Sequence, residues 1–402
     1  MIEYTIRDGF PKFQDLPWDY SLTNWPGLTD RLEEVQRGIS RHPVVFVNYE
    51  GSLYAIKELP TGVALSEYQM LLKMQEQHLP CVEPVGYVQI STGNCQRSAI
   101  ITSYLDLSLP YRSLFMHSNL GRYRDHLLDA IAGLLVQLHL AGFFWGDCSF
   151  SNTLFRRDAG ALQAYLVDAE TTEHHACPLS PMLRHHDLEI MQANIQRDVF
   201  DLKEDDSQIA KQLDIEIDQY IRISYRALWE EVTRDEIIHA NERYRVQERI
   251  RALNLLGFSV QVVETVATEA GDKLRLHALV TDRNFHRNQL LELTGLTSEE
   301  MQSRQIMNEI HELRAYLAHS GNRAVPLSVA AFHWLKNIYL PTIEKLKPLL
   351  SPNNSGGIIN DPVELYCQVL EHKWYLSEAV KHDVGHQIAV EDYVKRFGTQ
   401  EC

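Results

Sequence analysis

The alternation of apolar and polar positions in the first quarter of the chain predicts a small antiparallel sheet. Apolar residues also recur with a helical period between residues 61 and 77, which predicts one helix beside the strands. The first 30 residues are rich in Pro and Trp and are expected to form an irregular lead-in that packs onto another element. The predicted strands cover residues 32–36, 44–48, 53–59, 85–90 and 98–105. Together these elements form a small lobe of five strands and one helix.

Beyond this lobe the apolar period lengthens to that of helices, with one hairpin between them. The first helix carries its apolar side chains on one face and ends at Gly142. The hairpin turns at Asp158-Ala159-Gly160. The predicted elements are a helix over residues 124–141, strands over 153–156 and 161–167, and a helix over 188–202. A charged stretch, residues 203–207, then indicates a linker near a domain boundary.

The second half of the chain is predicted to be mostly helical. Asp361-Pro362 supplies an N-cap and a first-turn proline, which predicts a last long helix running past Ser377. The other predicted elements are helices over residues 218–232, 234–255, 299–319 and 327–338, and strands over 258–266 and 273–280. The predicted fold class is therefore α+β, with a two-lobed domain over residues 1–216 (lobes about 30–105 and 106–216) and a mostly helical α+β domain over residues 217–402.

Composition narrows the functions that these domains can have. The 402 residues include 38 Lys and Arg against 54 Asp and Glu, and the net charge of -16 argues against a nucleic-acid partner. The six cysteines form no CxxC pair and no regular spacing, so they predict neither a disulfide framework nor a zinc ribbon. The longest apolar segment, residues 130–145, is interrupted by polar side chains and too short to cross a membrane. We therefore expect a cytoplasmic protein.

Two charged residues in the small lobe have the spacing of a nucleotide-binding pair. Lys57 ends the strand Tyr54-Ala55-Ile56-Lys57, and Glu67 follows in the predicted helix. A strand lysine can hold the α- and β-phosphates of a nucleotide while a helix glutamate fixes its orientation. Without further partners, such residues are more often solvated surface charges.

Three polar residues of the second lobe complete a set suited to phosphoryl transfer. Asp147 and Asn152 lie in a loop after the long helix, and Asp168 ends the hairpin. Phosphoryl transfer needs a carboxylate to orient the attacking hydroxyl, and an amide with a second carboxylate to hold Mg²⁺. The same residue types also cap turns and end strands, but here all five occur in order on the required elements. The sequence therefore predicts a kinase-like nucleotide and Mg²⁺ site.

On these residues the sequence resembles the protein-kinase-like superfamily, and most closely the bacterial lipopolysaccharide-kinase-like proteins, over residues 32–202. The resemblance implies a two-lobed kinase-like fold and an ATP- and Mg²⁺-dependent phosphotransferase. It assigns Lys57 to the phosphates with Glu67 as its helix partner, Asp147 to the role of catalytic base, and Asn152 with Asp168 to the metal.

The resemblance also places the purine ring against the segment that joins the lobes. Thr102, Tyr104 and Leu105 are the expected contacts there, and guanine stays an alternative to adenine. The phosphate-covering loop has one glycine, Gly38, instead of a triple-glycine motif, so Ser40 and Arg41 are expected to donate to phosphate oxygens. An ordinary hairpin turn with solvated arginines is the equal alternative.

Two triplets depart from the protein-kinase pattern. Trp145-Gly146-Asp147 stands in place of His-Arg-Asp, and Asp168-Ala169-Glu170 in place of Asp-Phe-Gly. Glu170 is a candidate for an extra metal ligand or an exposed charge. The histidines at 174, 175, 185 and 186 and Cys177 match no known ligand spacing, so no metal beyond Mg²⁺ is assigned.

The segment Glu371-His372-Lys373-Trp374-Tyr375-Leu376-Ser377-Glu378 is denser in polar and aromatic groups than a core helix needs. One interpretation is a functional face that includes Glu364. The other is an amphipathic helix whose Trp374 packs inward while its charges face water. Residues 218–397 resemble an uncharacterised domain that accompanies lipopolysaccharide-kinase-like modules, which implies an architecture and no activity.

Three functions are compatible with these features. The first is an active phosphotransferase acting on an unidentified hydroxyl of a small molecule, glycan, lipid or protein. The second is a nucleotide-binding pseudokinase that signals to a protein partner, as the altered triplets and the single-glycine loop suggest. The third is a protein adenylyltransferase that holds ATP in a flipped pose.

Overall fold

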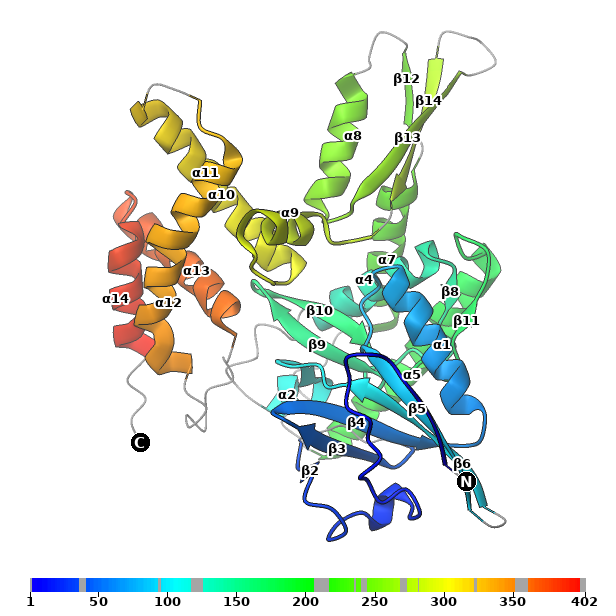
Figure 1. Cartoon of the computed structure of the whole chain (residues 1–402). Coiled ribbons are helices and arrows are strands. Elements are labelled where there is room, and N and C mark those ends of the chain that lie inside the picture. Colours follow the sequence, from blue (N-terminus) through cyan, green and yellow to red (C-terminus); the bar gives the residue numbers. More distant parts are fainter. Residues whose placement is uncertain are drawn as a thin grey trace. The chain divides into compact units, whose positions relative to one another are not determined.

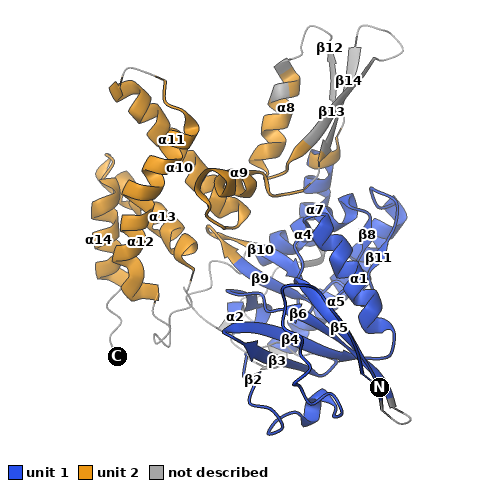
Figure 2. Cartoon of the chain, in the orientation of Figure 1, with its two compact units in different colours: residues 1–156, 163–231 blue, residues 157–162, 232–402 orange. Residues whose placement is uncertain are grey.

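The structure is a computed structural model that describes residues 2–35, 41–92, 95–116, 126–205, 217–234, 236–239, 244–267, 273–280, 282–321, 324–350 and 361–397. The chain forms two compact units (Figure 2). Unit 1 comprises residues 1–156 and 163–231, and unit 2 comprises residues 157–162 and 232–402. The boundary predicted after Glu216 lies outside the described residues. The expected α+β class is confirmed, with a sheet-rich lobe and a helical lobe in unit 1 and a mostly helical unit 2.

The sheet-rich lobe has six antiparallel strands in the order β1-β5-β6-β4-β3-β2 (Figure 1). Five predicted strands were one too few, because Ile2–Ile6 pairs with β5 at the edge of the sheet. This segment alternates as a strand should, but it is short and its partner lies some 80 residues away in the chain. The strands are β1 Ile2–Ile6, β2 Leu32–Glu33, β3 Val44–Tyr49, β4 Ser52–Leu59, β5 Pro84–Thr92 and β6 Cys95–Ser103.

The remainder of the lead-in covers one face of this sheet, as predicted. Phe13, Trp18 and Trp25 are buried in a cluster that includes Ile56 of β4. Side chains alternate along a strand, so Lys57, the neighbour of Ile56, points to the other face. Helix α1 (Val63–Glu76) packs against β5 and β6 and brings Glu67 within hydrogen-bond distance of Lys57. The lead-in therefore seals one face of the sheet and leaves the other for the site.

The helical lobe of unit 1 is built around α4, whose residues are buried on nearly every side. Helix α5 begins at Pro181, seven residues before the predicted start, because Ser180 caps it by accepting a bond from the Leu183 amide. The helices are α2 Tyr111–Met116, α4 Leu127–Leu140, α5 Pro181–Asp205 and α7 Ile217–Thr233. The strands are β7 Leu109–Pro110, β8 Phe143–Phe144, β9 Thr153–Asp158, β10 Ala161–Leu166 and β11 Glu173–His174, and a 3₁₀ turn at Leu22–Asn24 lies in the lead-in.

Unit 2 has one three-stranded sheet and a set of helices. The helix predicted over residues 234–255 is wrong in its first part, where Glu236–His239 instead forms β12 and pairs with β14. The strands are β12 Glu236–His239, β13 Val260–Ala267 and β14 Lys273–Val280. The helices are α8 Tyr244–Leu255, α9 Phe285–Thr294, α10 Glu300–Gly321, α11 Leu327–Trp334, a π turn Leu335–Tyr339, α12 Leu340–Leu346, a 3₁₀ turn Lys347–Leu350, α13 Pro362–Val380 and α14 Gly385–Phe397. In the described part of the chain, no helix is both long enough and apolar enough to cross a bilayer.

Helix α13 begins as predicted, since Asp361 Oδ1 accepts a hydrogen bond from the Val363 amide at 2.9 Å. The interpretation in which Trp374 packs inward is wrong, because this side chain is 58% exposed. Glu364, on the same helix, is fully buried instead of facing water. One turn of α13 therefore carries a carboxyl side chain into the interior of unit 2.

The tip of the hairpin formed by β9 and β10 belongs to unit 2. Asp158 is completely buried there, and its Oδ1 accepts a hydrogen bond from the Gln302 amide at 2.8 Å. Burial, reinforced by the nearby Glu299 carboxylate, raises the pKa of Asp158 to about 8, although Arg283 opposes this shift. Asp158 is therefore protonated in the folded protein at neutral pH.

This buried acid predicts a pH dependence of stability. The unfolded chain releases the Asp158 proton near pH 3.8, whereas the folded chain keeps it to about pH 8. The free energy of unfolding of the wild type should therefore fall, relative to that of Asp158→Asn, by about 1.4 kcal/mol per pH unit within this window. Urea unfolding of both proteins at pH 5, 7 and 9 measures the difference. Parallel pH profiles would contradict a buried, protonated Asp158.

Candidate active site

A cavity of about 400 Å³ in unit 1 brings together most of the residues singled out in the sequence. Lys57 comes from β4, Asp147 and Asn152 from the loop before β9, and Asp168 from the end of β10. Gly38 and Ser40 lie outside the described residues. Four other expected contacts also line the cavity, namely Arg41, Thr102, Tyr104 and Leu105. Glu67 does not line it but lies behind Lys57.

Lys57 lies at the centre of two ion pairs. Its Nζ is 2.7 Å from Glu67 Oε1 and 3.0 Å from Asp168 Oδ1. Burial disfavours the charged lysine, but the two carboxylates together raise the pKa of Lys57 above its usual value. Burial likewise raises the pKa of Glu67 to about 7, against the opposing effect of Lys57. The lysine is therefore held as a cation that faces the cavity, as phosphate binding requires.

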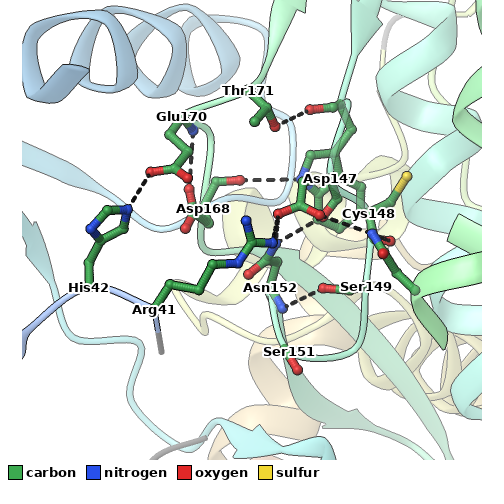
Figure 3. Close-up of polar contacts among 12 residues, drawn as sticks. Arg41, His42, Asp147, Cys148, Ser149, Ser151, Asn152, Asp168, Glu170 and Thr171 are labelled. Carbon is green, nitrogen blue, oxygen red and sulfur yellow. Dashed lines mark hydrogen bonds and ion pairs between the residues drawn. The ribbon is translucent and has the colours of Figure 1, made fainter. Parts of the chain in front are cut away.

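The Asp147 carboxylate is oriented by three side chains, two of which, Arg41 and Asn152, are labelled in Figure 3. Asn194 Nδ2 donates to its Oδ1 at 2.9 Å, and Asn152 Nδ2 donates to its Oδ2 at 3.1 Å. Arg41 forms an ion pair with the same Oδ2 at 2.6 Å. His42 lies 3.3 Å from Glu170 Oε2. The segment at residues 41 and 42 therefore reaches across the cavity to two of its carboxylates.

Trp145, the first residue of the altered triplet Trp145-Gly146-Asp147, supports the loop that carries Asp147. Its indole Nε1 donates to the Asp168 carbonyl at 3.2 Å, which ties the two polar segments together. Its own amide and that of Gly146 donate to Asp187 Oδ2 and Oδ1 at 2.7 and 2.8 Å. Asp187 is fully buried and also contacts His139 Nε2 at 3.1 Å. One buried carboxylate therefore fixes the backbone that leads into Asp147.

Gly146 is required at its position by both conformation and space. Its φ is +79°, and a Cβ atom there would lie 2.9 Å from the Thr171 carbonyl oxygen. We expect Gly146→Ala to lower the free energy of unfolding by about 2–3 kcal/mol. Gly9→Ala is the control, because Gly9 has a φ of +89° with open space around it and should cost only about 1 kcal/mol. Equal losses in urea unfolding would mean that the contact with Thr171 is unimportant.

The sequence did not point to the contribution of α5. Asp187, Asn194 and Asp198 all contact the loop between Trp145 and Asn152. Asp198 Oδ1 accepts the Ser151 hydroxyl at 2.7 Å. Their spacing of seven and four residues places them on one helix face, which is the only signal that was available.

The backbone of the segment expected to contact the purine is partly hydrogen-bonded within the sheet. Thr102 pairs with Ala55 and Pro84 as part of β6, and the Tyr104 amide donates to the Leu53 carbonyl at 2.9 Å. The Tyr104 ring packs edge-on against Phe46, with ring centroids 5.8 Å apart. The side chains at 102 and 104 and the chain from Leu105 onward are therefore the groups of this segment that line the cavity.

The oxygen donors of the site suit Mg²⁺. Asn152 turns its amide nitrogen to Asp147, so its amide oxygen is the atom that would ligate a metal, and the Asp168 carboxylate lines the same cavity. No group of three or more His, Cys, Asp or Glu side chains gathers as a metal site among the residues that the structure describes. Mg²⁺ commonly takes one or two protein ligands and completes its shell with phosphate and water. The residues present therefore fit a nucleotide-bound Mg²⁺.

Two family models match the chain. Residues 49–213 match the lipopolysaccharide kinase (Kdo/WaaP) family, and residues 227–397 match DUF4032, a domain of unknown function. Among solved structures, one titled "WaaP in complex with acyl carrier protein" is 14% identical, with a TM-score of 0.35, and the match covers 56% of this chain and 99% of that chain. No curated protein matches the chain.

Proposed function

We propose, from the premise that residues 49–213 form a lipopolysaccharide-kinase-like phosphotransferase domain, that this protein transfers the γ-phosphate of ATP to a hydroxyl acceptor with the help of Mg²⁺. The observation that carries the proposal is the position of Lys57, held between Glu67 at 2.7 Å and Asp168 at 3.0 Å in the same cavity as Asp147. This geometry supports the proposal, because phosphoryl transfer needs a cation for the phosphates next to an oxygen ligand for the metal.

Asp147 is the proposed base. Its carboxylate accepts the proton of the acceptor hydroxyl, and Asn194 and Asn152 keep it oriented. Mg²⁺ held by Asn152 and Asp168 would neutralise phosphate charge. Lys57 binds phosphate oxygens, and Glu67 keeps its ammonium group from turning away. For the hydroxyl to reach Asp147 Oδ2, Arg41 must leave that oxygen, and phosphate oxygens are the natural acceptors for its guanidinium.

The contact between Arg41 and Asp147 also favours a second function. An arginine on the proposed base keeps it from a hydroxyl, as would suit a pseudokinase that binds nucleotide and signals through its shape. In an active enzyme this contact opens when nucleotide binds, whereas in a pseudokinase it persists.

Nucleotide-induced stabilisation and product mass together test the proposal. We expect MgATP to raise the melting temperature of the full chain by several degrees. Lys57→Ala should lose this shift, while Lys12→Ala, which removes an exposed lysine of unit 1, should keep it. Intact mass after incubation with ATP and candidate acceptors then distinguishes added phosphate from added adenylate. A shift without any turnover would identify a pseudokinase, and no shift would refute nucleotide binding at this site.

A further inference from the structure

The hairpin of β9 and β10 connects the two metal-binding candidates at its base with unit 2 at its tip. Asn152 directly precedes β9, and Asp168 lies two residues after the end of β10. The Val167 amide donates to the Asn152 carbonyl at 3.1 Å, so the base of the hairpin holds these two segments side by side. Residues 157–162, at the other end, belong to unit 2 (Figure 2).

Two buried residues of unit 2 hold this tip, Gln302 through its backbone amide and its side chain and Glu364 through its carboxyl group. The Gln302 backbone amide donates to Asp158 Oδ1 at 2.8 Å, and its Nε2 donates to the Arg157 carbonyl at 3.1 Å. Glu364 Oε2 accepts the Ala159 amide at 2.9 Å and the Gln302 side chain at 2.9 Å. Gln302 is 1% exposed and Glu364 is fully buried. Removing the side chain of Gln302 or of Glu364 would leave buried polar groups of the hairpin tip without hydrogen-bond partners. The tip therefore has one strongly preferred position relative to these two residues.

The turn at the tip is itself held in an uncommon conformation. Ala159 and Gly160 both have positive φ, at +49° and +86°. Two consecutive left-handed residues form the mirror-image turn that suits a tight hairpin, but an alanine there is strained by about 1–2 kcal/mol. The bond from the Ala159 amide to Glu364 is made in this conformation and supports it.

We infer that unit 2 positions the metal-binding residues through this hairpin, with Gln302 and Glu364 as positioning residues. The inference rests on the proposed function, since it assigns Asn152 and Asp168 to the metal. The hairpin forms two strands of the three-stranded sheet β10-β9-β7. Paired strands are stiffer than a loop, because their ladder hydrogen bonds must break before one strand can move independently of the other. A displacement of the tip is therefore passed to the Asn152 and Val167 pair at the base, next to Asp168.

Unit 2 would thus act as a structural control on the catalytic unit. When the tip is held, the segments of Asn152 and Asp168 stay side by side, where these two residues would hold Mg²⁺. When it is released, the two segments can separate at the Val167 amide. The accessory unit would then set the metal affinity of the enzyme and leave its affinity for the metal-free nucleotide nearly unchanged.

Gln302→Ala in the full chain tests this inference, with Asn308→Ala as the control because Asn308 is exposed on the same helix. Two readouts are needed. The first is hydrogen exchange of the peptide that contains Val167, which we expect to be faster in Gln302→Ala and unchanged in the control. The second is Mn²⁺ affinity in the presence of ATP, which we expect to weaken by about 10-fold, as when supporting partners of metal ligands are removed. The affinity for metal-free ATP should stay within about twofold, because Lys57 is untouched.

The outcomes separate the inference from the proposed function. Unchanged exchange at Val167 in a folded Gln302→Ala protein would overturn the inference, as would unchanged Mn²⁺ affinity. If the wild type binds no Mn²⁺ in the presence of ATP, the proposed function is wrong. The inference is then wrong too, even if hydrogen exchange at Val167 is faster in Gln302→Ala than in the control. If Gln302→Ala does not fold, Glu364→Gln replaces it. This variant keeps the shape of the side chain, but an amide nitrogen in place of Oε2 cannot accept the hydrogen bonds from the Ala159 amide and the Gln302 side chain.

Discussion

Replacing Asp147 with asparagine should lower the rate of phosphate transfer by about 10²–10⁴-fold, the range that a positioned general base contributes. The substitution keeps the size of the side chain and an oxygen that can accept from Asn194 or Asn152. It removes the negative charge that takes up the hydroxyl proton. Nucleotide-induced thermal stabilisation should therefore remain, because Lys57 still pairs with Glu67 and Asp168. The measurement is single-turnover transfer from radiolabelled ATP.

The control for this experiment is Asp8→Asn, which removes the same charge from an exposed turn of unit 1. It should leave the rate unchanged. If Asp147→Asn transfers phosphate as fast as this control, Asp147 is not the base. If it also loses the thermal shift, the loss of rate reflects disturbed binding, and the assignment of its role would have to be withdrawn.

Replacing Asp187 with alanine should lower the free energy of unfolding by about 3–5 kcal/mol, as expected when one member of a buried hydrogen-bonded charge network is lost. The carboxylate accepts the Trp145 and Gly146 amides, and both would be left unpaired. Burial lowers the pKa of His139, so its neutral ring donates to Asp187 through Nε2 and accepts the Tyr225 hydroxyl at Nδ1. That ring would also lose its acceptor.

Urea unfolding measures this loss, and Glu189→Ala on the same helix is the matched control. Glu189 is half-exposed and contacts only surface histidines in the ion pairs that the structure describes, so its removal should cost less than about 0.5 kcal/mol. A similar small cost for Asp187→Ala would show that the loop before Asp147 is held by other contacts. We therefore expect a large loss of unfolding free energy when the buried carboxylate is removed and a negligible loss when the exposed one is removed.

Local pattern was sufficient for the elements whose residues are neighbours in the chain. Lys57 on a strand, Glu67 on the next helix and the hairpin turn at Asp158-Ala159-Gly160 follow from periodicity and turn chemistry, which act over a few residues. The strand at Glu236–His239 was missed because its pairing with β14 is a long-range contact that overrides the helical pattern around it. The edge strand at Ile2–Ile6 was missed for the same reason.

The candidate site divides in a similar way. Asp147, Asn152 and Asp168 could be found from their types and order, because the chemistry of phosphate transfer demands them. Asp187 and Asn194 could not be found in this way, because nothing in the neighbouring sequence indicates which residues a buried aspartate or asparagine on a helix contacts. Their importance comes from desolvation, which makes each buried bond costly to lose, and desolvation depends on packing from distant parts of the chain.

The order of residues was thus enough to indicate the class of chemistry and the positions proposed to perform it, because residue types and short-range spacing carry that information. The chain's three-dimensional packing added what supports those positions: the carboxylate beneath the Trp145 loop, the arginine on Asp147, and the assignment of residues 157–162 to unit 2. These depend on which groups are removed from water together, a property of contacts between residues far apart in sequence.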